Sequence, residues 1–239
     1  MTTQQIEVEE QEMGIWDHIG ELRNRLIKAM AALVLTTLLN VMFMATYFIE
    51  FLARPIGGMQ KLVSIEVTES VGVYMRVALL AGFILALPII LYQLMAFIVP
   101  GLYPHERRWL YVSIPVATLL FIGGTAFSYY VMLPAALPFL IGFLPVTALP
   151  RVSTYINFVT NLMFWIGVSF ETPLVVFVLA KFKIVTPQML LKQWRFAIVI
   201  IAVLAAMITP TVDPVNMALL MAPLFAIYLL SILFANFAR

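Results

Sequence analysis

The sequence contains no cysteine and little charge. Of its 239 residues, 11% are Asp, Glu, Lys or Arg, less than half the share of roughly 25% in soluble domains. The missing cysteines exclude disulfide bonds, thiolate metal sites and a cysteine nucleophile. The net charge is only +2, and no basic stripe is long enough to follow a phosphate backbone, which argues against a nucleic-acid partner. With 63% hydrophobic residues and a mean hydropathy of +1.03, the composition indicates a polytopic membrane protein.

Sequence motifs of catalysis are also missing. The chain has no HExxH and no glycine-rich phosphate loop with its lysine,. Its two histidines, His18 and His105, lie outside the apolar stretches. GVSF at 167–170 has the GxSx form of an intramembrane serine protease, but no span supplies a histidine to act with it. We therefore expect a protein that is not an enzyme and that has no cofactor and no metal site.

The apolar stretches predict an all-α fold with six transmembrane helices. A crossing needs about 20 apolar residues. The acidic start lacks the basic and apolar parts of a secretory signal. We therefore predict that the first span acts as an uncleaved insertion signal. The predicted domains are an acidic cytoplasmic tail at 1–20 and a single membrane domain at 21–239. The predicted spans are 26–49, 77–99, 109–133, 155–180, 196–209 and 216–236, of which the last two are short,.

Two connections between the spans have distinctive sequences. Pro134, Pro138, Pro145 and Pro150 follow the third span, and this density of proline predicts a loop over 134–153. The connection at 50–72 is long enough to hold one or two short helices.

Basic residues indicate the orientation in the membrane. If the N-terminus is cytoplasmic, six spans place ten of the 14 Lys and Arg residues in the cytoplasm. This positive-inside bias predicts that both termini are cytoplasmic. The four basic residues on the other side are Arg54, Lys61, Arg76 and Arg151.

Two carboxylates stand beside predicted cytoplasmic helix ends. Glu21 and Arg25 are i, i+4 neighbours, and from the residues alone an intrahelical ion pair is the simplest interpretation,. Glu106 follows a bend rich in proline and glycine and stands at a helix start,. There a carboxylate interacts favourably with the exposed N–H groups and the helix dipole.

A third carboxylate lies inside a span. Glu171 is the only charged residue between 155 and 180. A charged carboxylate facing lipid costs several kcal/mol, so we expect Glu171 to face protein, a partner or water. Pro173 lacks an N–H and disturbs the helix one turn away. Together they predict a polar notch in the cytoplasmic half of the span; a glutamate that is hydrogen-bonded within the bundle and purely structural is the alternative.

Four motifs in order carry a family resemblance: ELRNRL before the first span, FIVPGLYPHERR between the second and third, FETP in the fourth, and TPTVDP between the last two. This pattern resembles TatC, the multispanning receptor subunit of the twin-arginine protein translocase, and covers residues 14–236. The resemblance implies a receptor that recognises signal peptides with two consecutive arginines at a cytoplasmic patch.

The resemblance also implies roles for individual residues. Glu21 and Glu106 match the acids that bind the two arginines of the signal peptide. A guanidinium makes two parallel charge-assisted hydrogen bonds to a carboxylate, which a lysine cannot do. Pro55 and Asp213 match positions in the extracytoplasmic loops, while Glu171, with Pro173, matches an acidic position in the fourth span. The other positions that shape the signal-peptide patch are Arg23, Leu22, Phe97, Pro100, Leu102 and Tyr103.

The resemblance further implies single-span partners of the TatA and TatB type, folded cargo moved by the proton-motive force, and a location in the prokaryotic cytoplasmic (inner) membrane. The lipid bilayer is the surrounding medium, and a homo-oligomer is possible. Some family members carry an acid late in the sixth span, where this chain has Leu229 after Tyr228. Two other functions stay open: a secondary transporter or proton relay, and a scaffold or insertase that binds signal helices by apolar contact only.

Overall fold

The computed structural model describes residues 15–99, 104–142, 149–209 and 214–237, and the side chains of these residues except Ile15 and residues 104–110. The described residues form helices and a single isolated β-bridge. This confirms the prediction of an all-helical fold. The helices are α1 (Ile15–Phe43), α2 (Ala45–Ala53), α3 (Glu69–Ile98), α4 (Pro104–Phe127), α5 (Leu133–Gly142), α6 (Val152–Phe170), α7 (Thr172–Lys181), α8 (Pro187–Lys192), α9 (Trp194–Ile208) and α10 (Pro214–Phe237).

Five stretches of the described chain are long and apolar enough to cross a membrane, as expected of a polytopic membrane protein. They are Trp16–Phe43, Glu69–Ile98, Tyr111–Gly142, Val152–Lys181 and Pro214–Phe237. Helix α9 is apolar but has only 15 residues, about 23 Å of helix, which is less than the roughly 30 Å of a hydrocarbon core. Helix α10 has 24 residues, so the prediction that the last span is also short is wrong.

The predicted loop over 134–153 is wrong in its first part, because residues Leu133–Gly142 form α5. A π-helical turn, Ser128–Met132, joins α4 to α5 and bends the pair. Pro134 stands in the first turn after it, where a missing N–H costs little. Leu133, Ala136 and Leu137 are buried, so packing maintains the helix through Pro138. Residues 143–148 lie outside the described part.

The connection before α3 contains short helices, as predicted, but it begins earlier than predicted: α1 ends at Phe43 and α2 begins at Ala45, whereas the predicted first span runs to 49. Helix α2 is followed by the 3₁₀ turns Arg54–Ile56 and Met59–Lys61. Two tyrosines fasten α2 to the rest of the protein: the hydroxyls of Tyr129 and Tyr155 donate to the carbonyls of Phe51 and Leu52, each at 2.7 Å. Helix α3 begins at Glu69, eight residues before the predicted span, and so includes Arg76.

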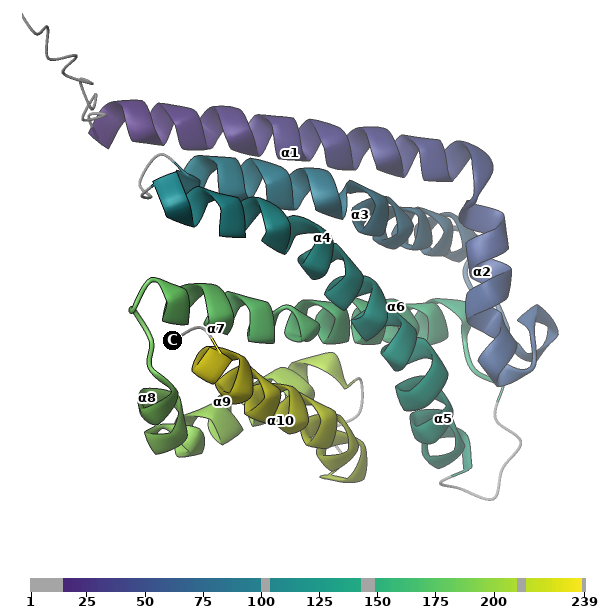
Figure 1. The fold of residues 1–239 in the computed structure, drawn as a ribbon. Helices are drawn as coiled ribbons and strands as arrows, with labels where there is room; N and C mark the ends of the chain where they lie inside the picture. The colour runs from purple at the N-terminus through teal and green to yellow at the C-terminus, as the bar shows by residue number, and fades with distance from the viewer. Residues whose placement is uncertain (1–14, 100–103, 143–148, 210–213, 238–239) are drawn as a thin grey trace, which may run out of the picture.

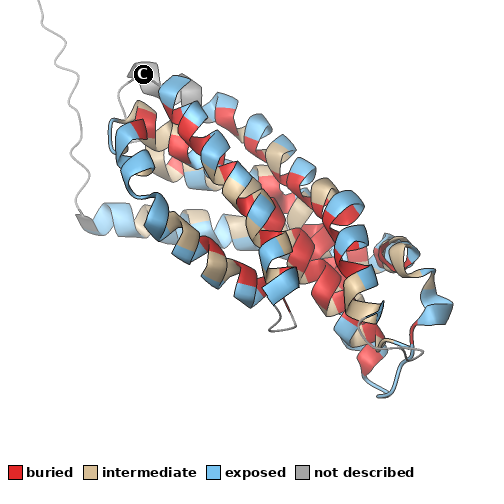
Figure 2. Ribbon diagram, turned by 90° about the horizontal axis from the view of Figure 1, so that it is seen from below, coloured by how far each residue is buried: buried red, intermediate tan, exposed pale blue. Residues whose placement is uncertain are grey.

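Helix α6 is the centre of the bundle. It packs against α3 and α4, and also contacts α9 and α10, while α1 lies along the outer side of α3 (Figure 1). Ile156, Val159 and Ile166 of α6 are completely buried. Figure 2 shows the buried positions along the inner sides of the helices and exposed ones along their outer sides. In a membrane protein those outer positions face lipid.

Glycines allow two helix pairs to approach closely. A Cβ on Gly82 of α3 would lie 2.5 Å from Oγ1 of Thr37 and 2.7 Å from its Cα, in α1. A Cβ on Gly167 of α6 would lie 2.8 Å from the ring of Phe121 in α4. Thr36 strengthens the first crossing because its hydroxyl donates to the carbonyl of Gly82 at 2.8 Å. Small residues at crossings are typical of membrane helix pairs.

Ion pairs join the starts of α3 and α6. Arg151 contacts Glu66 at 2.7 Å and Glu69 at 3.1 Å, and hydrogen bonding to Glu66 and then Glu69 raises the pKa of Arg151. Glu69 also accepts from the backbone N–H of Ser153 at 2.7 Å. A β-bridge between Val63 and Arg151 completes this junction.

The crossing of α1 and α3 gives a prediction for stability. Gly82→Ala should lower the thermal unfolding temperature in detergent, because overpacking a close contact costs about 1–3 kcal/mol. Gly123→Ala is the matched control, since a Cβ at that helical position meets no atom within 4 Å. Equal melting temperatures for Gly82→Ala and the unsubstituted protein would show that the crossing is not tightly packed.

Candidate functional site

Three helix ends meet at one end of the bundle, on the left in Figure 1: the start of α1, the end of α3 and the start of α4. We call this the first end. The sequence analysis placed the acids Glu21 and Glu106 here, on separate elements. The structure places the backbones of both at this end, in α1 and in the first turn of α4.

Glu21 is a partly buried carboxylate whose two oxygens differ. Oε1 accepts from Arg25 Nη2 at 3.1 Å and from Nε at 3.3 Å, which confirms the predicted intrahelical ion pair. Oε2 is buried and has no hydrogen-bond partner among the described residues. Arg25 also lies 3.5 Å, through Nη1, from Oε1 of Gln93 in α3. Glu21 thus already binds one guanidinium and retains an unused acceptor.

Aromatic stacking holds α1 against α3 next to this carboxylate. The rings of His18 and Phe97 lie 4.2 Å apart with planes 17° from parallel. Phe97 therefore lies beside the start of α1, close to Glu21, and its role in a signal-peptide patch stays a prediction. Leu22 and Arg23 are exposed on α1, so they are accessible to a ligand at this end.

The remaining residues of the predicted patch are only partly covered by the structure. The backbone of Glu106 is the third residue of α4, in agreement with the predicted helix start, but its side chain lies outside the described ones. Pro100, Leu102 and Tyr103 lie outside the described residues, as does Asp213.

Glu171 interrupts the fourth long stretch. Helix α6 ends at Phe170 and α7 begins at Thr172, so the acid stands at the junction, two residues before Pro173. Glu171 is half-buried, and its Oε1 has no hydrogen-bond partner among the described residues. At the predicted position of the notch the structure therefore has a helix break and a carboxylate oxygen without a partner among the described residues, while the notch itself stays a prediction. Pro55 lies in a 3₁₀ turn at the opposite end.

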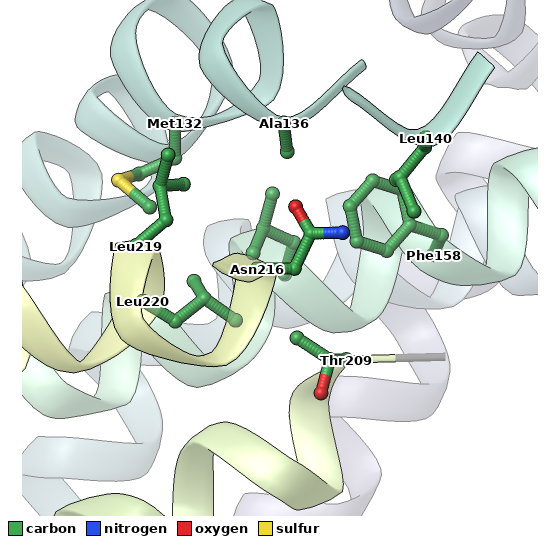
Figure 3. A pocket seen from close by; sticks show the side chains of 9 residues that line it. Met132, Ala136, Leu140, Phe158, Thr209, Asn216, Leu219 and Leu220 are labelled. Atoms are coloured by element: carbon green, nitrogen blue, oxygen red, sulfur yellow. The ribbon is translucent and has the colours of Figure 1, made fainter. Parts of the chain in front are cut away.

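A small cavity lies between α5, α6 and the facing ends of α9 and α10 (Figure 3). Its volume is about 10 Å³, on the order of what one water molecule needs. Apolar side chains line most of it, and the polar lining comes from Thr209 and from Asn216, which is 3% exposed. Leu229, where the resemblance implies an acid in some family members, is exposed farther along α10.

Comparison with known proteins decides the family. Residues 17–223 match the family model described as Sec-independent protein translocase protein (TatC). The chain belongs to the TatC family. It is 34% identical to the TatC of Carboxydothermus hydrogenoformans, over 97% of this chain and 96% of that protein. It is 36% identical to the TatC of Aquifex aeolicus, over 95% and 96%. A crystal structure of the twin-arginine translocase receptor TatC is 37% identical, covers 92% of this chain and 99% of its own, and superposes with a TM-score of 0.82.

Membership in the TatC family makes the chain a multi-pass component of Sec-independent protein transport, and not an enzyme. Relatives occur in bacteria and in chloroplasts, including one from Arabidopsis thaliana that is 35% identical over 92% of this chain.

The sequence analysis did not single out several residues that the structure places beside the predicted site residues or in the small cavity. His18 was considered only as a catalytic group, and Gln93 was not considered at all. Gln93 stands four residues before Phe97, on the same helical face, and this spacing is a signal that could have identified it. Thr209 is the first residue of the TPTVDP motif and Asn216 follows two residues after it, but nothing in their spacing predicts a shared cavity.

Proposed function

We propose that this chain is the receptor of a twin-arginine translocase and binds paired-arginine signal peptides at the first end of the bundle. The observation that carries the proposal is the state of Glu21. One oxygen of this carboxylate already holds the guanidinium of Arg25, while the other is buried and has no hydrogen-bond partner among the described residues. A buried acceptor without a partner is costly, and an incoming guanidinium supplies two charge-assisted donors.

Glu106 provides the second carboxylate in this proposal. Its position in the first turn of α4 puts it on an element that packs against α3, the helix that carries Phe97 and Gln93. Two carboxylates on separate helices offer one position to each arginine of the pair. Phe97 and the exposed Leu22 offer apolar contact to the residues around the arginines.

The proposed orientation places the first end and both termini in the cytoplasm, with six helices crossing the prokaryotic inner membrane. The positive-inside bias supports this orientation. The short α9 is then the fifth of the six crossings, and the bilayer thins beside it at modest cost. The apolar part of the signal peptide lies along the membrane face of the helices.

Partner recruitment completes the proposal. Single-span proteins of the TatA and TatB type pack against the outer faces, and their assembly moves the folded cargo, driven by the proton-motive force. Glu171 serves as a polar contact for a partner helix or trapped water, because its Oε1, which has no partner among the described residues, stands at a helix break.

Loss of either carboxylate should weaken peptide binding. For Glu106→Ala and Glu21→Ala in nanodiscs, we expect the affinity for a twin-arginine peptide to fall by on the order of 1–3 kcal/mol, the range for hydrogen bonds to charged groups. Isothermal titration or fluorescence anisotropy measures this, with Glu50→Ala as the control because Glu50 is an exposed carboxylate on α2 at the other end.

A Lys-Lys version of the peptide should show a similar loss, since lysine lacks the bidentate fork. Unchanged affinity in the Glu106 variant would refute the receptor site. Equal binding of the Arg-Arg and Lys-Lys peptides would favour a scaffold that recognises only the apolar segment.

Glu171→Gln should retain transport in vesicles, because a protonated glutamate and a glutamine can both donate a hydrogen bond. Glu171→Leu, which removes all polar capacity, should reduce transport. Complete loss of transport in Glu171→Gln would instead assign a titrating carboxylate to the mechanism and favour a proton relay.

A further inference from the structure

A second polar site lies at the opposite end of the bundle, where α3 and α6 begin (right in Figure 1). A recess of about 390 Å³ opens there between the two helices. We call it the α3–α6 recess. Its charged and polar lining consists of Glu66, Glu69, Arg76, Arg151, Ser153 and Asn157.

The two carboxylates of this recess are already engaged. Glu69, whose side chain is 1% exposed, accepts from the backbone N–H groups of Ser153 and Ile65 and contacts Arg151. Glu66 is 63% exposed and also contacts Arg151 at 2.7 Å. These three side chains form a closed cluster, and Glu66 meets water on its free side.

Arg76 is not neutralised in the same way. Its Nε donates to Oγ1 of Thr160 at 2.8 Å and its Nη2 donates to Oδ1 of Asn161 at 2.7 Å. Both acceptors are neutral, and no carboxylate of the described chain lies within ion-pair distance of Arg76. Its Nη1 and the side-chain amide of Asn157 make no hydrogen bond to any described residue. The recess therefore has spare donors and an unpaired positive charge.

The depth of Arg76 in the membrane restricts what can neutralise it. It lies seven residues after the start of α3, about 10 Å along the helix. The 30 residues of α3 span about 45 Å, so a centred hydrocarbon core of roughly 30 Å begins some 7–8 Å from either end. Arg76 is then just inside the apolar boundary, from which arginine side chains extend to the headgroup layer.

The surface next to the recess suits acyl chains. Val71, Met75 and Leu79 of α3 are 65%, 49% and 50% exposed, and they continue from the recess toward the middle of the membrane. A soluble anion gains nothing from such a surface, whereas a lipid places its phosphate at the guanidinium and its chains on these side chains.

We propose that the α3–α6 recess binds the phosphodiester of a membrane phospholipid, with Arg76 and the amide of Asn157 as its donors. In the orientation proposed above, this lipid belongs to the extracytoplasmic leaflet. The site is independent of the arginine-peptide site, and neither depends on the other for its test. A bound lipid at this junction stabilises the packing of α3 on α6.

Lipid titration of the delipidated protein in detergent tests the proposal. Native mass spectrometry counts bound dioleoyl phosphatidylglycerol as its concentration is raised. Arg76→Gln should weaken the tightest binding step by on the order of tenfold, the effect of one charge-assisted contact. Arg54→Gln is the control, because Arg54 is an exposed arginine near the same end, over the ring of Phe51 at 5.7 Å. It should bind lipid like the unsubstituted protein.

Asn157→Leu provides a second variant, since it removes the amide without altering the hydrogen bonds of Arg76, and it should weaken lipid binding severalfold at an unchanged melting temperature. It decides the matter if Arg76→Gln fails to fold.

Equal lipid binding by the unsubstituted protein and both variants would overturn the proposal. If the variants bind lipid normally but no longer bind a single-span partner protein, the recess binds a carboxylate of that partner instead. Displacement of the lipid by millimolar inorganic phosphate would make it a free-anion site. Equal binding of dioleoylglycerol, which lacks the phosphate, would show that only apolar contact matters.

Discussion

The close crossing of helices is the constraint on which this structure depends. Apolar surface gains nothing by moving from lipid to protein, so membrane helices associate through tight packing and hydrogen bonds. Here Gly82 brings α3 against α1, and Gly167 brings α6 against α4. Because α6 also packs against α3 and contacts α9 and α10, these two crossings are part of the packing that positions the helix ends with their polar groups.

The two ends of the bundle have opposite chemistry. At the first end, Glu21 keeps a buried oxygen without a partner in the described chain, so this end has spare acceptors. At the other end the carboxylates are engaged and Arg76 keeps spare donors. A cationic peptide segment suits the first end, and an anionic headgroup suits the second. Each site combines residues of two different helices, so each depends on the crossings between them.

The sequence predicts well where helices run through lipid and which charges lie at their ends. The Glu21–Arg25 pair follows from i, i+4 spacing, and the break at Glu171 follows from Pro173. The sequence-based prediction fails where packing overrides local preference. Pro134 and Pro138 predict a loop, but their buried neighbours keep this segment helical as α5. The sequence also does not predict which helices meet: Gln93 approaches Arg25 and His18 approaches Phe97 across long stretches of chain. Local spacing puts Gln93 on the same face as Phe97, but it does not say that this face packs against α1.

Site-specific cross-linking tests the central claim of arginine recognition most directly. A photoreactive residue at position 21 or 106 is activated while a twin-arginine precursor is bound to membranes that contain this protein. The account predicts adducts from both positions to residues next to the arginine pair, and none from position 50 at the other end. Adducts only to the apolar segment of the signal peptide, or equal adducts from position 50, would contradict it.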